Sequence, residues 1–144
     1  MSDLKYEKYI ITQPKPNEMA EFVKDMPPDD VRKRVLYLDH EVVKDAFYVA
    51  SSWFFKGTGP GPEAHTHDFD EVLGFYGTNP DDVYDLCGEV EFWIGDEQYL
   101  LTKTFLAFIP AGLSHCPLRV IRADRPIFHF SVGPQGMYGG MLNK

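Results

Sequence analysis

The residues best suited to chemistry in this 144-residue sequence lie between Glu63 and Glu71, in the run Glu-Ala-His-Thr-His-Asp-Phe-Asp-Glu. Side chains two residues apart in an extended chain point to the same face, so His65 and His67 can converge on one point. Glu71 has the same parity and can join them if the chain bends slightly after His67. Two imidazoles and one carboxylate suit a first-row divalent metal ion. The alternative is a set of surface polar residues at a loop exit, although Glu71 leads into the apolar segment Val72–Phe75, where an unpaired charge would be costly.

A second candidate ligand, His115, follows the run Ile-Pro-Ala-Gly-Leu-Ser. Pro110 and Gly112 predict a tight turn that starts a new strand, and His115 stands near the beginning of that strand. A metal site inside a β-barrel needs a ligand from a distant strand, which His115 can supply.

Together these residues resemble the two motifs of the cupin superfamily. The first motif is matched by Gly59, His65, His67, Glu71 and Gly77, and the second by Pro110, Gly112 and His115. The resemblance implies an all-β fold, the double-stranded β-helix or jelly-roll barrel, which is often dimeric. It also implies one divalent transition metal ion (Fe, Mn, Ni, Zn or Co), held by His65, His67, Glu71 and His115. Four such ligands on a six-coordinate ion leave two positions for water, dioxygen or a bidentate substrate, whereas structural zinc is usually closed by four ligands.

The second motif departs from the cupin pattern at two positions. Thr104 stands at the position of the motif's leading glycine, and Arg119 stands at the position of its closing asparagine. Arg119 has the same parity as His115, so it can point inward, where a guanidinium would bind a carboxylate or phosphate. The alternative is an exposed strand residue beside Arg122 and Arg125.

Two further residues have an orientation that matters for function. His129 lies in the apolar run Ile127–Ser131, in which either parity can face the barrel. Facing inward, it would be a candidate general acid or base, because imidazole titrates near neutrality; otherwise it is a core or dimer-face histidine. Cys116 directly follows a candidate ligand, so we expect it to point the other way and not to bind metal as a thiolate.

The elements that must position these residues are short strands, with little helix and no βαβ alternation. One short helix is predicted from Asn17 to Lys24, capped by Asn17 and ended by Pro27 and Pro28. Alternation and β-propensity predict strands over Tyr6–Thr12, Val31–Leu38, Phe47–Phe55, Glu71–Tyr76, Glu89–Ile94, Gln98–Leu101, Phe105–Ile109, Cys116–Ile121 and Ile127–Val132. We expect residues 1–45 to form N-terminal strands and the helix packing on the barrel, 46–133 the cupin barrel, and 134–144 a C-terminal tail.

Composition excludes several function classes. The formal net charge of -8 is the wrong sign for a protein that binds a phosphate backbone, so we expect no nucleic-acid partner. No apolar run is long enough to span a membrane, and the first residues lack the apolar region of a signal peptide. Cys87 and Cys116 are expected to be reduced thiols in a cytoplasmic protein.

The function predicted from the sequence is that of a metal-dependent enzyme acting on a small organic substrate, with dioxygenase-type oxidoreductase chemistry favoured. The alternatives are a metal-dependent isomerase or decarboxylase/lyase, and a non-catalytic cupin that binds a small ligand. A homodimer without membrane contact is expected, and Arg119 and His129 are the candidate catalytic residues beside the four metal ligands.

Overall fold

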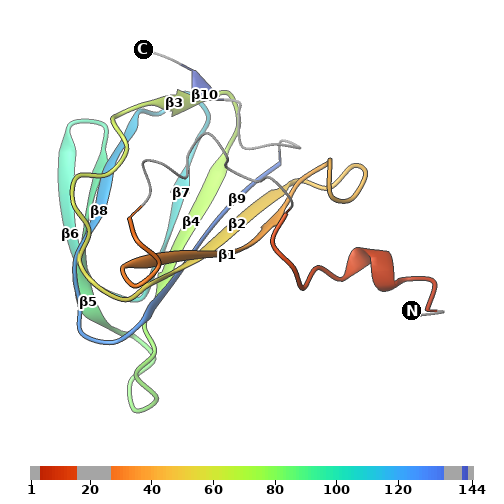
Figure 1. Ribbon diagram of the computed structural model, residues 1–144. Coiled ribbons are helices and arrows are strands. Elements are labelled where there is room, and N and C mark those ends of the chain that lie inside the picture. The colour runs from red at the N-terminus through yellow and green to blue at the C-terminus, as the bar shows by residue number, and fades with distance from the viewer. Residues whose placement is uncertain (1–3, 16–26, 135–140, 143–144) are drawn as a thin grey trace.

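The computed structural model describes residues 4–15, 27–134 and 141–142, and strands dominate these ranges (Figure 1). The helical part of this described chain is one 3-10 turn, η1. The elements are η1 (Glu7–Tyr9), β1 (Arg32–Leu38), β2 (Tyr48–Phe54), β3 (Thr66–His67), β4 (Glu71–Tyr76), β5 (Asp85–Ile94), β6 (Glu97–Lys103), β7 (Phe105–Ile109), β8 (His115–Ala123), β9 (Ile127–Gly133) and β10 (Met141–Leu142).

The strands form two facing antiparallel sheets. One sheet has the order β1-β2-β9-β4-β7, the other has the order β6-β5-β8, and β3 pairs with β10 at one end. From β4 onward the chain passes repeatedly between the two sheets, which Figure 1 shows as two walls of one barrel. This arrangement is the predicted double-stranded β-helix.

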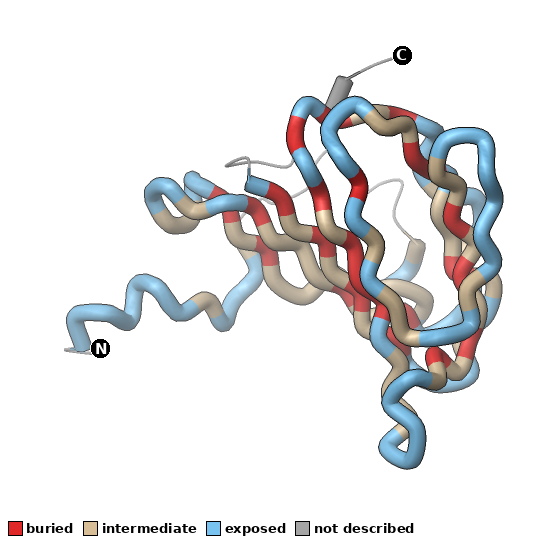
Figure 2. Tube along the Cα trace, turned by 180° about the vertical axis from the view of Figure 1, so that it is seen from behind, coloured by how far each residue is buried: buried red, intermediate tan, exposed pale blue. Residues whose placement is uncertain are grey.

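The core lies between the sheets because the strands alternate buried and less buried residues, as Figure 2 shows along the tube. In β9 each odd-numbered residue from Ile127 to Gly133 is buried. One apolar cluster includes Phe54, Phe75, Val90 and Ile127. A second cluster, of Leu73, Phe92, Ile109 and Cys116, lies nearer the candidate ligands.

The strands predicted from Val31 onward are confirmed, with β5 beginning at Asp85 instead of Glu89. The strand expected over Tyr6–Thr12 is wrong, because η1 occupies part of this segment and its side chains are mostly exposed. A strand is stabilised by pairing with a neighbour, and β-propensity alone does not supply one. The helix expected from Asn17 to Lys24 lies outside the described residues. Within the described ranges, no helix is long and apolar enough to cross a membrane.

Candidate metal centre

The candidate ligands are brought together at one end of the barrel. His65 precedes β3, His67 lies in β3, and Glu71 and His115 are the first residues of β4 and β8. The backbones of His65 and His115 form a reciprocal pair of hydrogen bonds, each N–H donating to the other carbonyl oxygen at 3.0 Å. Gly112 N–H donates to the carbonyl oxygen of His67 at 2.9 Å. The turn before His115 is therefore tied directly to the His65-Thr66-His67 segment.

The three imidazoles form one compact cluster. His65, His67 and His115 each offer a ligand atom, and these atoms lie within 4.8 Å of one another. The ring centroids of His65 and His115 are 4.6 Å apart, and those of His67 and His115 are 5.0 Å apart. All three residues are buried, with exposed fractions of 2–5%. Such a buried convergence of imidazoles is suited to a metal ion.

Backbone carbonyls fix the tautomers of two of these histidines. His65 Nδ1 donates to the carbonyl oxygen of Glu63 at 2.7 Å, and His115 Nδ1 donates to that of Leu113 at 3.0 Å. A carbonyl oxygen can only accept, so in each ring Nε2 carries the lone pair needed for a metal. His115 Nε2 is buried and has no hydrogen-bond partner among the described residues. A cation at this point would satisfy it.

Glu71 lies beside the cluster as a buried carboxylate. Its Oε1 is 3.3 Å from His115 Nε2 and 3.6 Å from His67 Nε2, and its Oε2 accepts a short hydrogen bond from the Tyr48 hydroxyl. Burial opposes ionisation, but the contacts with His115 and Tyr48 outweigh it and hold the pKa of Glu71 below its ordinary value. The carboxylate is therefore present as an anion, the form that binds a metal.

Burial also prepares His67 for metal binding. Its ring stacks on Phe69 at 4.8 Å between centroids, with an interplanar angle of 16°. Desolvation lowers the pKa of His67, and the neighbouring histidines add to this, whereas the charge of Glu71 acts in the opposite direction. The neutral imidazole that a metal requires is thus favoured.

Arg119 is not brought to this cluster. Its Nε donates to Glu91 Oε1 at 2.6 Å, and 40% of its side chain is exposed. Phe92 of β5 pairs with Leu118 of β8, and Ile94 pairs with His115. A step of two residues on β5 therefore stands opposite a step of three residues on β8. This bulge shifts the alternation, so Leu118 packs against the core and Arg119 points outward. Of the two orientations left open for Arg119, the structure has the outward one.

His129 points inward but lies in a different layer from the ligands. It pairs with Phe75, which is four residues beyond Glu71 on β4, or about 13 Å along an extended strand. His129 Nδ1 donates to the carbonyl oxygen of Gly74 at 2.9 Å, and its ring stacks on Phe75 at 4.1 Å. The structure therefore places His129 among aromatic residues of the core, away from the three imidazoles.

Cys116 also departs from its expected orientation. The bulge leaves it 5% exposed, in the apolar cluster with Leu73, Phe92 and Ile109 instead of on the outer face. Burial, with a smaller effect of the Glu71 charge, raises the pKa of the Cys116 thiol to about 12. Burial thus opposes ionisation of this thiol.

Tyr48 is a site residue that the sequence interpretation missed. It is fully buried in β2, and its hydroxyl orients the carboxylate of Glu71. The available signal was weak: Tyr48 is one aromatic residue in an apolar strand, and its pairing with Glu71 depends on long-range contacts between β2, β9 and β4.

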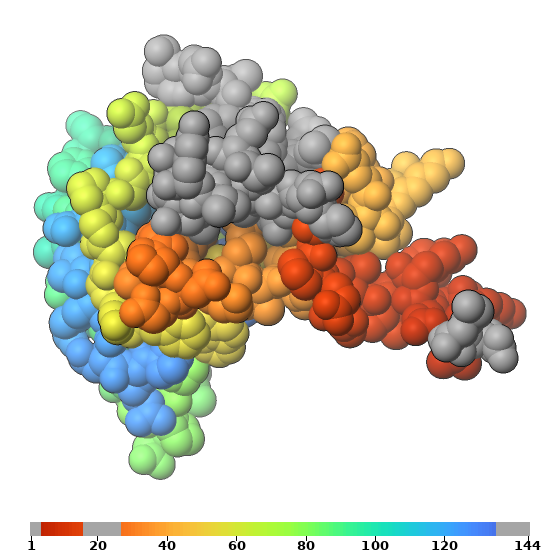
Figure 3. All heavy atoms as spheres, viewed as in Figure 1, coloured from red at the N-terminus to blue at the C-terminus, as the bar shows by residue number. Residues whose placement is uncertain are grey.

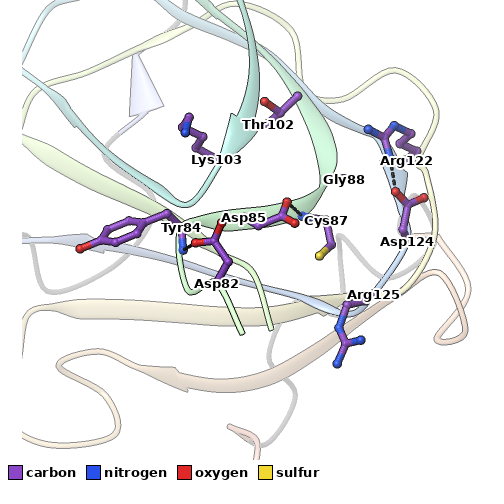
Figure 4. A pocket seen from close by; sticks show the side chains of 10 residues that line it. All are labelled: Asp82, Tyr84, Asp85, Cys87, Gly88, Thr102, Lys103, Arg122, Asp124 and Arg125. Carbon is purple, nitrogen blue, oxygen red and sulfur yellow. Dashed lines mark hydrogen bonds and ion pairs between the residues drawn. The ribbon is translucent and has the colours of Figure 1, made fainter. Parts of the chain in front are cut away.

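A separate cleft of about 470 Å³ lies toward the other end of β8 (Figure 4). It is lined mostly by charged residues of both signs, among them Asp82, Asp85, Lys103, Arg122 and Arg125. Arg122 lies seven residues beyond His115, roughly 20 Å along the strand. This cleft is thus distinct from the histidine cluster.

No protein-family model and no curated protein matches the chain. Among solved structures, an oxalate oxidase matches with a TM-score of 0.53 and 14% identity, over 99% of this chain and 66% of that one. DMSP lyase DddQ from Ruegeria pomeroyi DSS-3 matches with a TM-score of 0.42 and 19% identity, over 68% and 43%. A cupin-like protein from Thermotoga maritima matches with a TM-score of 0.48 and 16% identity, over 77% and 72%.

The chain therefore has the double-stranded β-helix fold of cupin-type proteins. It spans less than half of the DMSP lyase and about two thirds of the oxalate oxidase. At these identities the likeness concerns the fold, and function has to be argued from the site.

Proposed function

We propose that the protein is a metal-dependent enzyme acting on a small organic molecule at the site of His65, His67, Glu71 and His115. The observation that carries this proposal is the convergence of three buried imidazoles beside a buried, ionised carboxylate. An anion and several polar nitrogens are costly to bury without a compensating charge, and a divalent cation supplies it. The ligand types suit Fe, Mn, Ni, Zn or Co.

The residues around the ligands prepare the site before any metal arrives. The carbonyls that accept from His65 and His115 hold both rings with Nε2 available, and Tyr48 holds the carboxylate of Glu71. Once bound, the metal ion would supply Lewis-acid activation of a substrate oxygen or, if it is iron, activation of dioxygen. The neighbouring apolar cluster keeps water away from one side of this site.

Among the possible reactions we favour dioxygenase-type oxidation. Isomerisation and decarboxylation generally need a protein group that moves a proton, and His129, the residue predicted for such work, lies elsewhere. Arg119 is paired with Glu91 on the outer face, and His129 is held in another layer of the barrel. Oxidation at an open metal site needs fewer protein side chains that donate or accept a proton.

The first test is metal content. Protein purified without oxygen should hold one metal ion per chain by elemental analysis, and adding that metal to the chelated protein should raise its melting temperature. His67→Ala and His115→Ala should abolish both effects, because each removes a ligand. His40→Ala is the matched control, since His40 is an exposed histidine remote from the cluster in sequence. A wild-type protein without stoichiometric metal, melting alike with and without metal, would refute the proposal.

The second test distinguishes the reaction classes. Oxalate oxidase with the same fold has been crystallised with its substrate analogue glycolate, so small hydroxy acids and keto acids form a rational first panel. Oxygen consumption that depends on substrate and metal is the expected result. Turnover without oxygen would instead indicate an isomerase or lyase, and saturable binding without turnover would indicate a ligand-binding protein.

We also propose that the working form is the homodimer implied by the cupin resemblance. Light scattering in solution, which should give twice the 16.5 kDa mass of one chain, tests this.

A further inference from the structure

The cleft near the end of β8, here called the charged cleft, is large enough for a small molecule. Its volume of about 470 Å³ lies within the range of roughly 300–1,000 Å³ typical of small-molecule sites. Its walls come from the loop before β5, the start of β5, the end of β6, and the turn between β8 and β9 (Figure 4). Figure 3 shows the loop in green and the turn in blue at the same lower end of the molecule. None of the four metal ligands lines the charged cleft.

The charged cleft exists because β5 arches away from β6. Asp85 pairs with Lys103, and Val90 pairs with Leu101. Four residues of β5 therefore stand opposite Thr102 alone. Extra residues on one strand bend that strand out of the regular ladder, and such bulges are common beside functional sites. The hollow is thus built into the pairing of the three-stranded sheet.

The arch of β5 is fixed by contacts with its surroundings. Cys87 has a positive φ of 53°, which is uncommon for a residue with a side chain, and its N–H donates to Asp85 Oδ1 at 2.9 Å. The carbonyl oxygen of Cys87 accepts the N–H of Asp124 at 2.7 Å. Gly88 packs closely on β8, because an added Cβ would lie 2.4 Å from the carbonyl oxygen of Arg122. This wall is therefore formed before any ligand arrives, which lowers the entropic cost of binding.

The acidic residues of the charged cleft already have partners within the protein. Asp82 Oδ1 accepts the N–H of Tyr84 at 3.0 Å, and Asp85 accepts the N–H at the apex of the arch. Asp124 forms a short ion pair with Arg122. These carboxylates hold the loop, the arch and the turn in shape, and part of their charge is compensated there.

Two cations of the charged cleft, Lys103 and Arg125, are not engaged in this way. Neither side chain forms an ion pair or a hydrogen bond with another residue in the described part of the chain. In Figure 4 they stand on opposite sides of Asp85 and Cys87. Arg125 is close enough to oppose the rise in the pKa of the Cys87 thiol that burial and Asp85 cause. Although the chain has a net charge of -8, positive charge without an acidic partner thus borders this hollow on two sides.

We propose that the charged cleft binds a small molecule with two anionic groups, one held by Lys103 and the other by Arg125. A guanidinium matches a carboxylate or phosphate with two parallel hydrogen bonds, whereas an ammonium acts as a point charge. Because the two cations stand on opposite sides, a molecule with an anionic group at each end fits them better than a single ion does. This proposal does not rest on the metal-dependent function.

The first test measures binding by calorimetry at constant ionic strength, on protein freed of metal and then of chelator by dialysis. The probes are succinate, with two carboxylates, and 3-phosphoglycerate, with one carboxylate and one phosphate. Acetate is the probe with one anionic group. At least one of the first two should bind with a Kd at least tenfold lower than that of acetate. The tighter of the two identifies the preferred anionic group.

Matched variants assign the binding to the two cations. Lys103→Gln and Arg125→Gln each remove one charge and should each raise the Kd of the tighter probe by about tenfold. Lys33→Gln is the control, because Lys33 is an exposed cation on β1 of the other sheet and lies outside the charged cleft. It lowers the net charge equally and should leave the Kd unaltered. All three positions are exposed, and equal melting temperatures without the probe verify that the variants fold.

An NMR titration of the wild-type protein locates the bound probe. The amide signals of Cys87, Gly88 and Arg125 should shift on addition of the tighter probe, whereas those of His65 and His115 should not.

Three results would overturn the proposal. They are no binding of either probe at millimolar concentration, the same Kd for the two cleft variants as for Lys33→Gln, and shifts confined to the histidine cluster. Metal content is measured separately on the same proteins. A chain that holds metal but binds neither probe refutes the charged cleft alone, and a chain that binds a probe but never holds metal refutes the metal-dependent function alone.

Discussion

The buried ring of His129 should make the protein less stable as the pH falls below neutrality. His129 is 7% exposed, donates from Nδ1 to the carbonyl oxygen of Gly74, and stacks on Phe75. Burial lowers its pKa to about 3, and the positive charges of Arg32 and Arg34 act in the same direction. Protonation of this ring is therefore strongly disfavoured in the folded state.

The sign and size of the effect follow from this shift. In the unfolded chain the ring titrates at its ordinary pKa of 6.5, so below that pH the unfolded state takes up a proton that the folded state does not. The contribution of His129 to stability is present above pH 6.5 and is lost as the pH falls toward 3. Between pH 7 and pH 5 the loss is about 2 kcal/mol, with a slope approaching 1.4 kcal/mol per pH unit.

The variant His129→Asn isolates this contribution. Asparagine does not titrate, and its side-chain amide can donate to the carbonyl oxygen of Gly74 in place of Nδ1. Urea unfolding of both proteins, each with chelator, gives the free energy of unfolding at pH 7, 6 and 5. The wild-type value should fall by about 2 kcal/mol more than the variant value, whereas titration of all other groups cancels in the comparison. Parallel pH profiles, or an NMR titration that protonates folded His129 near pH 6.5, would refute the reasoning.

Three other substitutions test the geometry of the site and the barrel. Tyr48→Phe removes the hydrogen bond to Glu71 and should weaken metal binding by about tenfold or more, measured by competition with a chelator. Arg119→Ala removes an outward, partly exposed ion pair with Glu91. Metal affinity should therefore not change, and the free energy of unfolding should fall by less than about 1 kcal/mol. Loss of metal binding in this variant would contradict the outward placement. Gly61→Ala drives its new methyl group into a backbone carbonyl of β8 and should destabilise the fold by more than about 1 kcal/mol in urea unfolding, whereas Gly59→Ala, with open space around it, should not.

Local alternation predicted much of the site and failed where the strand is irregular. His65 and His67 share a face because they lie two residues apart in extended chain, and Glu71 has the same parity. The turn at Pro110 and Gly112 indicated His115, and the cupin resemblance joined the four residues into one ligand set. Counting onward from His115 left an inward Arg119 open, and the structure excludes it because β8 carries an extra residue opposite β5. The backbone of Cys116 has a positive φ of 79°, which is uncommon for a residue with a side chain. Pro117 signals an irregularity here, because proline within a sheet is confined to edges and bulges, but the place of the extra residue depends on how the two strands pair.

The position of His129 along the barrel could not be predicted for a different reason. Alternation can say which face of β9 the ring occupies, but its height along the barrel depends on the register that pairs His129 with Phe75. That register is a long-range property of two strands more than fifty residues apart. The position of Tyr48 beside Glu71 was hidden for the same reason.

The two parities of the β9 sequence differ in polarity. In the run from Ile127 to Val132, His129 shares its parity with Ile127 and Ser131, whereas the other parity carries only Phe128, Phe130 and Val132. In the folded chain the parity of His129 is buried in the core, and Phe128 and Phe130 lie on the opposite face of the sheet. Polarity alone would have turned His129 and Ser131 toward water, and the pairing of β9 with β2 and β4 decides the opposite.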